Sequence, residues 1–133
     1  MYSKAKLGLS VLILGSTALW AHHQFSSEFD ANRPVTLTGT VSRVDWTGPH
    51  ASLYMHSQSE GGVNQQLRLE MASPAFLTER GIKASAFKAG EQLTVHAYRA
   101  TDGSRLASAR VITTAKGEDL QVADPQDDGG PLK

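Results

Sequence analysis

The sequence predicts a mostly β protein: a small five-stranded OB-like barrel with one short helix between strands three and four. Five segments alternate apolar and polar residues with the period of two that marks a half-buried strand. A helical segment that begins with proline separates the third of these segments from the fourth. Three strands, one helix and two more strands is the order of the OB-type barrel, and an open antiparallel sandwich is the alternative.

The N-terminus has the layout of a secretory signal peptide. Lys4 and Lys6 form a basic start, an apolar run covers residues 7–14, and small residues follow as far as Ala18. This run is shorter than the roughly 20 residues that span a bilayer, so we expect a cleaved signal over residues 1–21 and no stable membrane anchor. The sequence therefore predicts a periplasmic or secreted protein.

Two cleavage points fit the small-x-small rule. A cut after Ala18 is the better local match, whereas a cut after Ala21 makes His22 the first residue of the mature chain. The two possibilities differ in one chemical respect, because the second cut leaves a histidine that carries its own free amino group.

Composition excludes several classes of protein. The 133 residues include 13 basic and 13 acidic residues, and loss of Lys4 and Lys6 with the signal leaves 11 basic residues and a formal charge of about −2. Without a basic patch, we expect no nucleic-acid partner. The chain has no cysteine, which excludes disulfides, a thiolate metal site and a lipidated cysteine anchor.

The first part of the mature chain is expected to be an irregular N-terminal segment over residues 22–34, followed by the domain proper over 35–123. The first strand is predicted at 35–41, where apolar and polar residues alternate. Gly39 inside this strand suggests a bulge or sharp bend, after which the strand continues toward Trp46 in shifted register.

The second and third strands are predicted over residues 50–57 and 66–71, joined by a flexible hairpin loop at 59–64. One face of each strand is apolar and is expected to point inward, whereas the other carries polar and charged side chains. The inward residues are Ala51, Leu53, Met55, Leu67, Leu69 and Met71.

A short helix should follow the third strand. Ser73 is a suitable N-cap, Pro74 fits the first helical position, and the helix is predicted over residues 75–80 with Gly81 ending it. Residues 83–88 are expected to add another turn.

The C-terminal part contains the last strands. The fourth strand is predicted over residues 92–99 and the fifth over 106–113, and the connection between them contains an Asp-Gly turn at 101–104. A weak last strand is expected at 119–123. Residues 124–133 are rich in Pro, Gly and Asp, so we expect a disordered tail.

The mature sequence resembles a family of small exported bacterial domains that is known only as a domain of unknown function. The resemblance lies in the stretch His22-His-Gln-Phe-Ser-Ser-Glu-Phe-Asp30 after the signal, in Trp46-Thr-Gly-Pro-His50, and in Tyr98-Arg-Ala-Thr-Asp-Gly103. It implies that the histidine pair directly follows the signal, which favours the cut after Ala21. Gly48 stands where the family usually has asparagine. The resemblance implies no particular activity.

The histidines are the candidate metal ligands. As the N-terminal residue, His22 would offer its amine and one imidazole nitrogen, which together can chelate one metal ion. A third nitrogen from His50, or less readily from His23, would complete a T-shaped site suited to copper(II), which favours tetragonal nitrogen ligation. The alternative is that adjacent histidines at a flexible start are merely solvated.

The register of the predicted hairpin brings a carboxylate to one of these histidines. If Ser57 pairs with Gln65, then Ser52 lies opposite Glu70, and His50 lies diagonally from Glu70. The carboxylate would then fix the tautomer of the imidazole, as the partner of a metal-ligating histidine does. In the competing interpretation, His50 hydrogen-bonds the turn and Glu70 pairs with an arginine.

The outward face of the second and third strands supports a different function. OB barrels commonly bind ligands there, and Tyr54, Arg68 and Glu70 would form a mixed aromatic and charged patch. This patch could hold an oligosaccharide, a peptide or a partner protein without any metal, or it could be an ordinary solvated face. The chain has few aromatic residues for a flat polymer-binding surface, so a binding protein is favoured over a redox enzyme.

Overall fold

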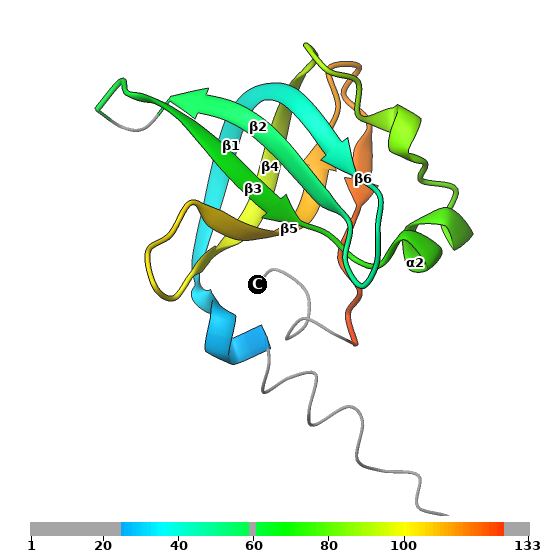
Figure 1. Cartoon of the computed structure of the whole chain (residues 1–133), viewed down its shortest axis with the longest axis horizontal. Helices are drawn as coiled ribbons and strands as arrows, with labels where there is room; N and C mark the ends of the chain where they lie inside the picture. The colour runs from blue at the N-terminus through cyan, green and yellow to red at the C-terminus, as the bar shows by residue number, and fades with distance from the viewer. Residues whose placement is uncertain (1–24, 59–60, 127–133) are drawn as a thin grey trace, which may run out of the picture.

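The structure is a computed structural model that describes residues 25–58 and 61–126 (Figure 1). The predicted signal, His22, His23 and residues 127–133 of the predicted tail lie outside the described residues. The described elements are β1 (Phe29–Asp45), β2 (Ser52–Gln58), β3 (Asn64–Glu70), α2 (Pro74–Glu79), the 3₁₀ helix η1 (Ala84–Ala86), β4 (Gln92–Ala100), β5 (Leu106–Thr113) and β6 (Asp119–Gln121).

Five of the strands form a closed ring of hydrogen-bonded pairs. β1 pairs antiparallel with β2 and with β4, β2 pairs with β3, and β4 pairs with β5. A parallel pairing between β3 and β5 completes the ring, and β6 adds to the free edge of β5. Figure 1 shows β2 and β3 extending beyond the ring as a hairpin. The prediction of a mostly β protein with a short helix between the third and fourth strands is confirmed.

The ring closes because β1 is long and irregular, and the bulge in it is not where the sequence suggested. The register between β1 and β2 shifts between Val41 and Arg43, so Ser42 is the extra residue, and its hydroxyl donates to the Tyr54 carbonyl at 3.0 Å. Gly39 has a different role. A Cβ atom there would overlap the carbonyl oxygen of His56, so glycine permits the close approach of β1 to β2.

The inward faces of the strands form the main core, as the alternating pattern predicts. The fully buried large side chains come from β2, β3, β4 and β5, from α2 and from the segment after β6: Leu53, Met55, Leu69, Leu77, Leu93, Val95, Ile112 and Val122. Trp46 and Phe76 pack against this core but are only partly buried. Burial of this apolar surface is the main stabilising contribution to the fold.

The helix α2 begins as predicted. Ser73 is the N-cap, its Oγ accepts the Phe76 N–H at 3.2 Å, and Pro74 occupies the first helical position. The helix buries Leu77 and ends at Glu79, one residue earlier than expected. No helix in residues 25–58 or 61–126 is long and apolar enough to cross a membrane.

The N-terminal segment is more ordered than the sequence suggested. Residues 25–28 are helical and β1 begins at Phe29, whereas we expected an irregular chain up to residue 34. Phe25 and Phe29 pack on Tyr98 and form a second, smaller apolar cluster, with ring centroids 5.4 Å apart for the two phenylalanines and 6.1 Å for Phe25 and Tyr98. Burial of these three rings holds the helical turn against the outer side of β4.

Candidate functional site

A row of polar side chains crosses the outer side of the ring where β3 ends. Ser52 of β2 lies opposite Glu70 of β3, Glu70 pairs with Ser108 of β5, and Ser108 pairs with Tyr98 of β4. The neighbours of Ser108 on β5 are alanines of the main core, so the Ser108 side chain points to the opposite side. The row thus runs from Ser52 at the start of β2 to Tyr98 in the second apolar cluster.

His50 joins this row through a direct contact with Glu70. The His50 Nδ1 and Glu70 Oε1 atoms are 3.2 Å apart, and the two side chains are 38% and 17% exposed. The predicted register is confirmed, because Ser57 pairs with Gln65 and Ser52 with Glu70. Arg68, the arginine next to Glu70, donates from Nε to Ser52 Oγ at 3.1 Å and acts on Glu70 through its charge.

The electrostatic surroundings of Glu70 are mixed. Burial is the largest effect and raises the pKa of the Glu70 carboxyl, while the charge of His50 opposes this rise. The Glu28 carboxylate raises the pKa of Glu70 further, and the Arg68 guanidinium lowers it. Glu28 comes from the N-terminal turn, so this turn brings a second carboxylate to the site.

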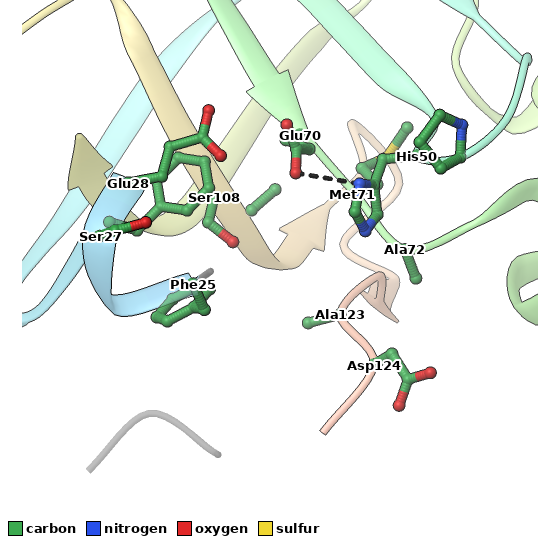
Figure 2. Close-up of a pocket in the computed structure, with 13 residues that line it drawn as sticks. Phe25, Ser27, Glu28, His50, Glu70, Met71, Ala72, Ser108, Ala123 and Asp124 are labelled. Carbon is green, nitrogen blue, oxygen red and sulfur yellow. Dashed lines mark ion pairs between the residues drawn. The ribbon is translucent and has the colours of Figure 1, made fainter. Parts of the chain in front are cut away.

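Glu28, His50, Glu70 and Ser108 line a cleft of about 610 Å³ (Figure 2). Its apolar lining comes from Phe25 and Phe29 of the N-terminal segment and from Met71, Ala72 and Ala109. Its polar lining comprises the carboxylates of Glu28, Glu70 and Asp124, the hydroxyls of Ser27 and Ser108, and the imidazole of His50. A cleft of this size with a few converging polar groups is typical of a small-ligand site.

Residues 10–109 match the model of a family described as a family of unknown function, DUF6152. The chain belongs to the DUF6152 family. The match covers His22, His50, Glu70 and Ser108, and it confirms the expected membership of an uncharacterised family. No match was found among curated proteins.

The described part of this DUF6152 protein does not by itself assemble a metal site. No group of three or more His, Asp or Glu side chains in residues 25–58 and 61–126 is placed to hold a metal ion. Of the three predicted ligands, the structure describes His50, whereas His22 and His23 lie outside the described residues. Glu70 contacts His50, which is the contact expected of a carboxylate that orients a metal-ligating histidine.

The outer face of β2 and β3 has a different character. The Arg43 guanidinium lies 3.6 Å from the centroid of the Tyr54 ring and stacks on it. Arg68 lies opposite Tyr54 in register, as predicted, and His56 is exposed on the same side. The aromatic surface expected at Tyr54 is therefore covered on one face by an arginine.

Most residues that line the cleft were not anticipated as site residues, among them Phe25, Glu28, Ser108 and Asp124. The spacing of Phe25 and Phe29, four residues apart, is typical of one helix face and is a signal for the ordered turn that carries Glu28. Nothing in the sequence places Ser108 or Asp124 near His50, because they come from segments that meet only when the ring closes.

Proposed function

We propose that this protein is an exported, periplasmic or secreted binding protein that holds a transition metal ion through His22 and His50, with copper(II) as the best match. In this proposal Glu70 is a positioning residue that orients the His50 ring. The observation that carries it is the 3.2 Å contact between His50 and Glu70 in a cleft that Phe25 also lines.

The contact with Glu70 suits His50 to metal binding. A neutral imidazole donates from one nitrogen and offers a lone pair on the other. If Nδ1–H donates to the Glu70 carboxylate, Nε2 is left to bind the ion. Metal-ligating histidines usually donate their second ring N–H to such a group. Figure 2 shows the second ring nitrogen of His50 pointing away from Glu70.

The length of the chain permits His22 to reach the same cleft. His22 precedes Phe25 by three residues, and an extended chain spans about 3.3–3.6 Å per residue. The backbone of His22 therefore cannot lie more than about 11 Å from that of Phe25, which lines the cleft. An amine and an imidazole nitrogen from His22, together with His50, would supply the three nitrogens that favour copper(II).

The proposal requires export and cleavage after Ala21. The basic start, the short apolar run and the small residues before Ala21 support a signal peptide. Cleavage after Ala18 would instead leave Leu19 as the N-terminal residue, and the chelate between the terminal amine and the His22 ring would not form.

We also propose that the ring of strands is an OB-like barrel. The cyclic order β1-β2-β3-β5-β4 and the position of α2 between β3 and β4 support this assignment.

A metal-free binding module is the second candidate function. It is supported by the grouping of Arg43, Tyr54 and Arg68 on the outer face of β2 and β3. Such a face could hold an anionic or hydroxyl-rich ligand. In that case Tyr54→Ala would abolish binding of that ligand. Added copper(II) would not change the affinity of the parent protein for the ligand.

The experiment begins with the exported protein purified from the periplasm or medium. Mass spectrometry of the intact chain should give a mature N-terminus at His22. Titration with copper(II), in competition with a chelator of known affinity, should show one tight site. A start at Leu19 would remove the terminal chelate from the proposal.

Variants then test the two described residues. His50→Ala should weaken copper(II) binding by about 100-fold or more, and Glu70→Gln by about 10–100-fold, the range typical of a hydrogen-bond partner of a ligand. His56→Ala is the matched control, since His56 is exposed on the outer face of β2. The electron paramagnetic resonance spectrum of bound copper(II) should change in the His50 variant and not in the control. Unchanged affinity and spectrum in His50→Ala would refute the proposal.

A further inference from the structure

The cleft beside His50 is far larger than a metal ion needs, and its lining suits an organic molecule. We propose that it binds a small organic cation, namely a primary ammonium group carried on an apolar body. This inference goes beyond metal binding and does not depend on it. It uses Glu28 and Ser108, which the metal proposal does not involve, together with Glu70.

The first observation is a hydroxyl that faces the cleft. Ser108 is 7% exposed, and its hydroxyl has no hydrogen-bond partner among residues 25–58 and 61–126. Figure 2 shows the oxygen directed into the cleft rather than back toward the strands. Because this oxygen faces the cleft, it can accept a hydrogen bond from a ligand that binds there.

The second observation is the sign of the charge. Glu28 and Glu70 approach each other closely enough for the charge of Glu28 to act on Glu70, and Glu70 pairs in register with Ser108. No lysine or arginine is present among the described residues that line the cleft. His50 contacts Glu70 at one end, and Arg68, which does not line the cleft, also acts on Glu70 through its charge. A ligand cation between the two carboxylates would relieve their repulsion, whereas an anion would increase it.

The number of acceptors matches an ammonium group. An ammonium ion has three N–H donors and no acceptor. The carboxylates of Glu28 and Glu70 and the hydroxyl of Ser108 are three acceptors around one part of the cleft (Figure 2). The Asp124 carboxylate lies apart from these three groups (Figure 2), and it accepts the Gln126 N–H at 2.9 Å.

The rest of the lining is apolar and indicates the ligand body. Phe25 and Phe29 form one wall, and Ala72 and Ala109 contribute to the other. These side chains offer no hydrogen bonds, so a ring or short alkyl chain next to the ammonium group would pack against them. A hydrated inorganic cation would leave this surface in contact with water.

The experiment uses benzylamine as the probe and the exported protein in the presence of a metal chelator. Binding is followed by chemical-shift changes in amide NMR spectra, with benzyl alcohol as the neutral analogue and benzoate as the anionic one. Benzylamine should bind at least tenfold more tightly than benzyl alcohol, and benzoate should be weakest. The shifts should centre on the N-terminal turn and on β5.

Two variants assign the contacts. Glu28→Gln should weaken benzylamine binding by about tenfold, and Ser108→Ala by about fivefold, as expected for one charged and one neutral hydrogen bond. Glu118→Gln, which changes an exposed carboxylate in the turn between β5 and β6, should have no effect. Neither Glu28 nor Ser108 belongs to the proposed metal site, so copper(II) binding should be unchanged in both variants.

Three results would overturn the proposal. Equal affinities for benzylamine and benzyl alcohol would show that the charge is not recognised. Unchanged benzylamine affinity in both variants would place the ligand elsewhere. Binding that appears only after copper(II) is added would make the amine a ligand of the metal and not of the carboxylates. Failure of copper(II) binding alone would leave this inference intact.

Discussion

The contact between β1 and β2 at Gly39 provides a direct test of how the ring is closed. Gly39 pairs with Ser57 of β2 and with Leu93 of β4, so β1 is held from both sides. An added Cβ would lie inside 3.0 Å of the His56 carbonyl oxygen, a separation that real Cβ atoms essentially never show, and 3.2 Å from Met55 Sδ. The overlap with backbone atoms requires β1 and β2 to separate.

The expected cost of Gly39→Ala follows from these contacts. Overpacking of this kind typically costs about 1–3 kcal/mol. The substitution also restricts the unfolded chain, which offsets about 0.4–1 kcal/mol of that cost. The net loss of unfolding free energy should be about 1–2 kcal/mol, which lowers Tm by roughly 4–16 °C in a domain of this size.

The assay is thermal and urea unfolding followed by circular dichroism. The matched control is Gly48→Ala, because a Cβ at Gly48 would meet nothing within 4 Å. That control should stay within about 0.5 kcal/mol of the parent. If Gly39→Ala unfolds at the same Tm as Gly48→Ala, the close approach of β1 to β2 is not what requires glycine.

Three further predictions concern other parts of the fold. Ser73→Ala should lower the unfolding free energy by about 1 kcal/mol in urea, because the Phe76 N–H loses its cap, whereas Ser73→Asp should restore it. Phe25→Ala should speed limited proteolysis before β1, since this ring anchors the N-terminal turn; an unchanged cleavage rate would argue against that anchor. Hydrogen bonds from Ser104 hold the pKa of Asp102 below its usual 3.8. Their stabilising effect is therefore present above that pH and disappears as the pH falls through the lowered pKa, so Asp102→Ala should destabilise at pH 7 and converge with the parent in acid.

Much of the fold could be predicted from local sequence patterns. The alternation of apolar and polar residues located the strands to within a few residues, except at the start of β1, and β5 matches its predicted range of 106–113. The cap at Ser73 and the register of the β2–β3 hairpin were also predicted, because hydrogen bonds to a helix start and pairing across a short loop are local effects.

The errors arose where distant segments meet. Gly39 is required by the approach of the β2 backbone, and the bulge is at Ser42, because strand pairing on both sides of β1 decides where an extra residue fits. The helical turn before β1 was missed because Tyr98, the residue that buries Phe25, lies more than seventy positions along the chain.

The sequence by itself determined the class of the fold, the family, and the proximity of His50 to Glu70 across one hairpin. These properties depend on side-chain periodicity and on short-range pairing, which a linear pattern encodes. The cleft was decided by the tertiary structure. Glu28 and Ser108 reach Glu70 only because β3 pairs with β5 and because the phenylalanine rings of the N-terminal turn are buried on β4, and both contacts join residues that no local pattern relates.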